Sequence, residues 1–271
     1  MKKLTALLTV VLLCVTLCSC SGGFVDTIKG YLGQDTEEKP AGYIETKEND
    51  LYVYDVFKKY IEIIEYKGEE KDVVVPSEID GKPVKVIGTL CFYRDYSVET
   101  LVIPEGVEAI ENTAFYYCTS LRRVKLPDSC TSYGERLFSW CTSLETITIP
   151  AGMTVIPRLA FNNCTSLSEI VWNDKITDIG VRAFSWCTSL TEIALPESVL
   201  TVDDYAFYNC GTLQSVTIPA HTVYSANAFE KCDNATLSGG IVKTEDEVSD
   251  VSSEISEPIA EESDASVQIS E

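Results

Sequence analysis

One motif recurs along the middle of this chain at a fixed interval. The segment AFYYCTSLRRVKLP occupies residues 114–127, and altered copies follow at 137–150, 160–173, 183–196 and 206–219. The phenylalanine of the motif stands at positions 92, 115, 138, 161, 184, 207 and 229, so successive copies are 23 residues apart and the last is 22. A short fixed period predicts stacked structural units. Each unit buries against its neighbours the apolar side chains that a single unit would leave exposed.

The apolar positions within each copy predict a short strand that ends at a proline. In the second copy Leu121, Val124 and Leu126 precede Pro127. Val124 and Leu126 alternate with a strand's period of two. Pro127 ends the strand, because proline has no N–H to donate to the next ladder bond. Each unit therefore contributes one strand to a sheet.

A second inward-facing stretch, marked by Val107 and Ile110 in the first copy, indicates a further short strand. The Ala-Phe-x-x-Cys segment fits a single helical or 3₁₀ turn whose Phe and Cys point inward. A coil of 23 residues leaves room for little more.

The pattern x-A-F-x-x-C-x-S-L-x-x-V-x-I-P resembles the BspA-like, treponemal-type leucine-rich repeats over roughly Val73 to Gly240. The resemblance implies a leucine-rich repeat solenoid, α/β or mainly β, with a parallel sheet on one face and short helical or 3₁₀ turns on the other. It also implies a bacterial surface protein that binds host or neighbouring-cell proteins. Two copies depart from the pattern: the first has Cys91 and Asp95 in the alanine and cysteine positions, and the fourth has Trp172 and Asn173 in place of Ile-Pro.

The first 20 residues have the layout of an export leader. Lys2 and Lys3 precede an apolar run, Leu4 to Leu17, that is shorter than the roughly 20 residues a spanning helix needs. The following Leu-Cys-Ser-Cys resembles a bacterial lipobox, although Cys18 stands where a smaller residue is usual. That resemblance implies cleavage before Cys20 and a lipid on its thiol, which would hold the protein at the outer face of the cell membrane. An ordinary secretory leader is the alternative.

Composition divides the rest of the chain. Gly and Pro predict a flexible spacer, Val-, Ile- and Tyr-rich stretches predict two or three antiparallel strands within Leu51 to Val75, and an acidic, aromatic-poor end predicts disorder. The predicted segments are a lipoprotein signal peptide (1–20), a spacer (21–42), a small N-terminal β cap with the lead into the array (43–90), six or seven rungs (91–240) and a tail (241–271).

Most cysteines outside the leader follow the repeat. In register, adjacent rungs lie about 4.8 Å apart, which leaves parallel Cβ atoms slightly too distant for disulfides, so we expect free, buried thiols. A line of cysteines also lacks the tetrahedral convergence that zinc needs. The column comprises Cys118, Cys141, Cys164, Cys187, Cys210 and Cys232.

Several function classes receive no support. A net charge of −21 argues against nucleic-acid binding, because phosphate contacts need a basic surface. The single histidine, His221, leaves one possible imidazole base, and no phosphate-cradling glycine motif occurs. Glu169 and Glu192 would stack on neighbouring strands, but in so acidic a chain such a pair does not indicate glycoside hydrolysis. We expect no catalysis, no metal and no cofactor.

Binding is the function that the pattern favours. Side chains that alternate outward from the strands include Arg123 and Lys125 in one rung, and Glu169 and Glu192 in two later rungs. Solenoids use such extended surfaces for protein recognition. Trp140 and Trp186 fall two rungs apart and support an alternative, a carbohydrate-binding surface protein that stacks sugars on aromatic rings. These tryptophans are also expected to pack over the turns against their neighbours.

Overall fold

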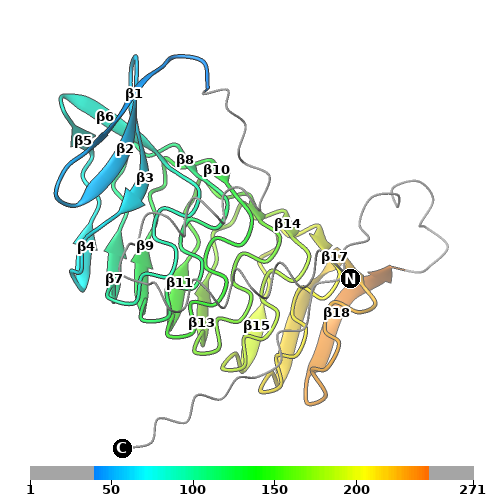
Figure 1. Ribbon diagram of the computed structural model, residues 1–271. Coiled ribbons are helices and arrows are strands. Elements are labelled where there is room, and N and C mark those ends of the chain that lie inside the picture. Colours follow the sequence, from blue (N-terminus) through cyan, green and yellow to red (C-terminus); the bar gives the residue numbers. More distant parts are fainter. Residues whose placement is uncertain (1–39, 244–271) are drawn as a thin grey trace, which may run out of the picture.

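The computed structural model describes residues 40–243, which form a β-solenoid of about eight turns (Figure 1). The predicted leader with Cys20, most of the spacer and residues 244–271 of the tail lie outside the described residues. Within 40–243 no helix is long and apolar enough to cross a membrane.

The strand predicted in each copy forms a parallel sheet along one side of the solenoid, here called the repeat sheet (Figure 1). Its strands stack in register, so that Thr100 lies opposite Arg123 and Val102 opposite Lys125. The sheet is interrupted between β9 and β11 and again between β13 and β15. Its members are β4 (Asp72–Val74), β7 (Thr100–Val102), β9 (Arg123–Lys125), β11 (Thr146–Thr148), β13 (Glu169–Val171), β15 (Glu192–Ala194) and the first parts of β17 (Ser215–Ser225) and β18 (Thr236–Lys243).

The second inward-facing stretch is also a strand. These shorter strands pair in parallel along a second side, with an interruption between β10 and β12, and the later ones continue into the ends of β17 and β18. Ile241 pairs with Val223 there, so the array extends to Lys243 and past the predicted boundary at 240. The short strands are β8 (Ala109–Ile110), β10 (Ser132–Tyr133), β12 (Val155–Ile156), β14 (Asp178–Ile179) and β16 (Thr201–Val202).

The third side of the solenoid consists of turns. The expected helical or 3₁₀ turn is not confirmed, because the Ala-Phe-x-x-Cys segments of the described chain form hydrogen-bonded turns instead. In the second copy Thr113 and Tyr117 have φ of 57° and 67°, and left-handed residues of this kind interrupt a right-handed helix. Main-chain bonds between rungs offset this strain: the Phe115 amide donates to the Leu137 carbonyl at 3.0 Å and the Tyr117 amide to the Ser139 carbonyl at 2.9 Å.

The phenylalanine column forms one continuous stack in the core. The rings of Phe115 and Phe138 are 5.0 Å apart with planes 9° from parallel, and those of Phe161 and Phe184 are 5.1 Å and 5°. These four side chains are fully buried. The 23-residue spacing therefore places equivalent residues on top of one another, as predicted.

A β cap covers the first rung, as expected. β1 (Tyr43–Glu48), β2 (Tyr52–Phe57) and β3 (Ile61–Tyr66) are antiparallel, and β3 then pairs in parallel with β6 (Lys82–Ile87), which forms a short hairpin with β5 (Glu78–Ile79). Tyr66 stacks on Phe92 at 4.8 Å, so the cap closes the end of the phenylalanine stack.

One detail of the predicted cap is wrong. The segment at 72–75 does not complete an antiparallel sheet, because β4 pairs in parallel with β7 and starts the repeat sheet. The third antiparallel strand is β1, whose sequence YIETKE is mostly exposed and carries little apolar signal.

The cysteine column is free and buried, as predicted. Each thiol donates to the phenylalanine carbonyl of the preceding rung: Cys141 Sγ lies 3.2 Å from the Phe115 oxygen, and Cys164 Sγ lies 3.1 Å from the Phe138 oxygen. The Phe138 oxygen also accepts the amide of Cys141 at 3.0 Å. A cysteine in this position thus fills the core as a small apolar side chain and supplies a second donor to a buried carbonyl.

In the first copy Asp95 takes the cysteine position without disturbing the fold. Its Oδ1 accepts the amides of Ser97 at 2.8 Å and Val98 at 2.9 Å. The carboxylate therefore closes its own loop.

We predict that Cys164→Ala destabilises the protein by about 1–2 kcal/mol at pH 7, because a buried hydrogen bond and some core volume are lost. Burial raises the pKa of the Cys164 thiol well above its ordinary value. The wild-type thiol therefore stays protonated in the folded state but ionises in the unfolded state above about pH 8.5, which favours unfolding. The stability advantage over the variant should be complete below that pH and shrink as pH rises. Urea unfolding under reducing conditions from pH 7 to 10 measures it, and a constant difference would contradict the assignment.

Candidate functional site

Two columns of side chains point outward from the repeat sheet, at the first and last residue of each strand. Arg123 and Lys125 are exposed at the two ends of β9, and the intervening Val124 packs against the core. Neither basic side chain has an ion-pair partner among residues 40–243. Their charges are therefore available to a binding partner.

Basic side chains in the loops that lead into the repeat sheet do form ion pairs. Arg122 pairs with Glu145 of the next rung at 2.5 Å, and Lys71 pairs with Glu99 at 2.6 Å. Exposed pairs of this kind are screened by solvent and contribute little to stability, but they remove charge from the loops. Arg123 and Lys125, by contrast, lie on the strand itself and keep their charge.

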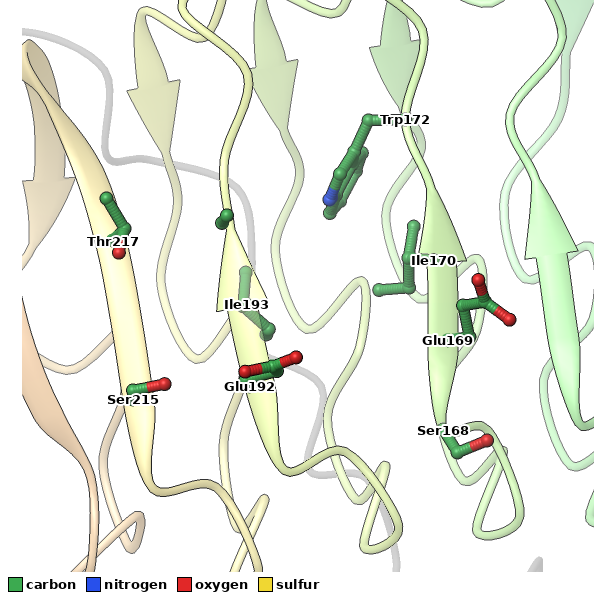
Figure 2. Close-up of a pocket in the computed structure, with 9 residues that line it drawn as sticks. Ser168, Glu169, Ile170, Trp172, Glu192, Ile193, Ser215 and Thr217 are labelled. Carbon is green, nitrogen blue, oxygen red and sulfur yellow. The ribbon is translucent and has the colours of Figure 1, made fainter.

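Glu169 and Glu192 lie on neighbouring strands of the repeat sheet, but no ladder joins the two strands. Both are exposed at the first positions of β13 and β15, but these two strands do not pair. A hollow of about 410 Å³ opens between the strands (Figure 2). Its lining residues are Ser168, Glu169, Ile170, Trp172, Glu192, Ile193, Ala194, Ser215 and Thr217.

Trp172 lines the hollow at the point where the ladder is broken. It occupies the core position that Ile149 and Leu195 fill in neighbouring rungs, and its half-buried indole meets Phe184 edge-on at 5.7 Å and 77°. An indole is much larger than the aliphatic side chain that this position normally holds, which predicts that it keeps the two strands apart. Figure 2 shows the ring in the space between β13 and β15.

The main-chain hydrogen bonds between rungs are also interrupted between β13 and β15. At the equivalent position the Ile149 amide donates to the Val171 carbonyl at 2.9 Å, and the Leu195 amide donates to the Thr217 carbonyl at 3.0 Å. Within the part of the chain that the structure describes, no such bond joins Trp172 to Ala194. Peptide groups along both walls of the hollow are therefore without their ladder partners.

Each wall of the hollow is held by the rung behind it. Asn173 replaces the usual proline, and its Nδ2 donates to the carbonyls of Pro150 at 2.6 Å and Met153 at 2.9 Å. On the other wall β15 pairs with β17. The remaining two sides of the solenoid stay joined, since β14 pairs with β16 and the Phe161 amide donates to the Ala183 carbonyl at 2.8 Å. The split is thus confined to the repeat sheet.

The hollow combines an aromatic ring, two carboxylates, hydroxyl groups and an apolar floor. Ile170 and Ile193 supply the floor, and Ser215 and Thr217 supply hydroxyls. The only imidazole of the chain, His221, is exposed on β17 and does not line the hollow. Among the described residues no group of three or more His, Cys, Asp or Glu side chains is placed to hold a metal. This chemistry suits binding.

Trp140 and Trp186 lie on the turn side and are not brought together with the charged residues of the repeat sheet. They are 36% and 42% exposed and occupy a left-handed position of their turns. Trp140 stacks on Tyr117 at 5.5 Å, and Trp186 meets Tyr208 at 6.2 Å, so both pack on neighbours as expected.

Trp172 is the site residue that sequence reasoning missed. Its signal was visible as a departure from Ile-Pro in the fourth copy. The departure alone does not say which side of the rung changes, and the structure shows that the fold continues on two sides and opens on the third.

Comparisons with known proteins agree with this architecture. The sequence matches the BspA type leucine-rich repeat region, in six copies, over residues 85–185 and 154–239. It is 31% identical to a solved leucine-rich repeat protein of T. pallidum, TpLRR, with 76% of this chain and 83% of that chain covered and a TM-score of 0.47. No curated protein matches the chain.

Two further solved structures are similar. A leucine-rich repeat protein from Bacteroides ovatus is 25% identical with a TM-score of 0.52, covering 66% of this chain and 55% of that one. A leucine-rich repeat protein from Eubacterium ventriosum is 24% identical with a TM-score of 0.54, covering 78% of this chain and 58% of that one. This chain therefore spans little more than half of either of these two proteins.

We predict that Trp172→Ile closes the hollow, because the smaller side chain fits the core position and lets β13 and β15 pair. The amides of residues 172 and 191 should then gain partners, and their hydrogen exchange should slow by about tenfold or more. Trp186→Ile, which changes an exposed tryptophan on the turn side, is the matched control. Unchanged exchange at both amides in Trp172→Ile would show that the indole does not cause the split.

Proposed function

The chain belongs to the BspA-type leucine-rich repeat family, and from this premise we propose that it is a non-catalytic surface protein that binds a protein partner through its repeat sheet. The observation that carries the proposal is the pair of exposed columns. Arg123 and Lys125 are free of ion pairs there, and Glu169 and Glu192 stand two and three rungs away. A surface with separated basic and acidic regions selects a partner of complementary pattern and orients it.

The location is part of the proposal. A leader with a lipobox-like Leu-Cys-Ser-Cys would place the mature protein outside the cytoplasmic membrane, with Cys20 as its lipid attachment site. The glycine-containing segment that follows would act as a spacer between the bilayer and the array. The repeat sheet would then face other molecules at the cell surface.

A second candidate, carbohydrate binding, rests on the exposed indoles of Trp140 and Trp186. They share one position of the repeat two rungs apart, which corresponds to about 10 Å, with Asn163 between them. Aromatic faces at this spacing suit stacking on sugar rings.

The charge pattern supports a direct test of protein binding. Arg123→Glu with Lys125→Glu should weaken capture of the partner by about tenfold or more, because like charges then face each other across the interface. Surface proteins captured by the mature chain from Ser21 onward are identified by mass spectrometry, and their affinities are then measured for each variant.

Lys175→Glu is the matched control, since Lys175 is exposed in a turn outside the repeat sheet. Capture that withstands the double reversal on β9 contradicts the proposed surface. Glycan binding that disappears in Trp140→Ala and Trp186→Ala would instead support the carbohydrate candidate.

Membrane attachment has its own prediction. Cys20→Ser should move the protein from the membrane fraction to the soluble extracytoplasmic fraction and abolish incorporation of labelled fatty acid, because the acylated thiol is lost. Cys18→Ser is the control and should leave both unchanged. If the native N-terminus carries no lipid by mass analysis, the chain has an ordinary secretory leader.

A further inference from the structure

The geometry points to a specific ligand for the hollow between β13 and β15: we propose that it receives a basic side chain, preferably arginine, of the protein partner. This inference rests on the proposed function and adds the chemistry of the contact. At about 410 Å³ the hollow lies at the lower end of the range of small-molecule pockets, about 300–1,000 Å³, and suits one long side chain rather than a large ligand.

Charge is the first argument. Glu169 and Glu192 border the hollow from opposite walls, and neither has an ion-pair partner among residues 40–243. In Figure 2 the Glu169 carboxylate lies on the side of β13 away from β15, and rotation about its side-chain bonds would bring it to the hollow. Two carboxylates without a cation favour a guanidinium, which offers several donors in one plane.

The indole is the second argument. Trp172 stands between the two strands with one edge on Phe184, so part of its ring remains open to the hollow (Figure 2). A cation placed over an indole face is attracted by the ring's negative potential. The isoleucine floor, Ile170 and Ile193, would contact the methylene stem of the same side chain.

Main-chain groups supply the third argument. The carbonyls of Val171 and Thr217 accept an amide from the preceding rung, and by the same register the carbonyl of Ala194 faces the hollow without that donor. A guanidinium has enough N–H groups to bind this oxygen as well as a carboxylate. A neutral sugar would use the hydroxyls and the ring, but it would leave the two carboxylates without a counter-charge.

The test uses the mature chain and N-acetyl-arginine amide as the probe, with N-acetyl-citrulline amide as its uncharged match. Trp140→Phe and Trp186→Phe are introduced first, so that fluorescence reports Trp172 alone. We expect millimolar binding of the arginine probe that weakens with salt, and at least tenfold weaker binding of the citrulline probe. Glu169→Gln and Glu192→Gln should each weaken arginine binding by about tenfold. Trp172→Ile, which removes the fluorophore and is therefore followed by NMR titration of the probe, should abolish it.

Glu197→Gln is the control, because Glu197 is exposed outside the hollow. Equal binding of the citrulline probe, no arginine binding at millimolar concentration, or binding of methyl glucoside alone would each overturn the assignment. If Trp172→Ile does not fold, the two glutamine variants decide it. Partner capture that is lost in the β9 reversal but retained in these variants would refute this inference while leaving the proposed function intact.

Discussion

The structure depends on the alignment of each rung with the next. Phenylalanine rings stack about one rung apart through the core, and main-chain bonds on the sheet and turn sides repeat the same offset. The left-handed turn residues are tolerated because their amides bond to the following rung, as those of Tyr117 and Trp140 do. The cysteines join the same system through their thiol donors. No rung could adopt this conformation without its neighbours.

Sequence periodicity was sufficient to predict the features that recur in every rung. The inward column of Phe115 and its equivalents, the free cysteines and the outward Arg123 and Lys125 all follow from position within the period. The turn conformation could not be predicted from the sequence. Thr113 and Trp140 have left-handed φ, but threonine and tryptophan usually avoid that region, so their residue types do not indicate it. Strand β1 was missed because its stabilising bonds come from β2 rather than from apolar burial of its own side chains.

The candidate site arises where the repeat is broken. The 23-residue pattern describes a continuous sheet, so it does not predict a hollow. Trp172, a substitution in an aliphatic position, lines the hollow between β13 and β15. The outward positions of Glu169 and Glu192 could be predicted from the repeat. The open space between them could not be predicted, because it depends on how the side chains of the two rungs pack in three dimensions. Regular rungs thus supply the scaffold, and the irregular rung supplies the chemistry.

The absence of cross-links in the cysteine column has a mechanical consequence. None of the cysteines in residues 40–243 is paired in a disulfide, so each rung is retained only by noncovalent contact with the rungs beside it. Under tension such a coil peels from an end, one layer at a time, and each released layer of 23 residues lengthens the chain by about 75–80 Å. A solenoid built this way is expected to yield gradually under load and to refold when the load falls, without any enzyme to re-form broken bonds.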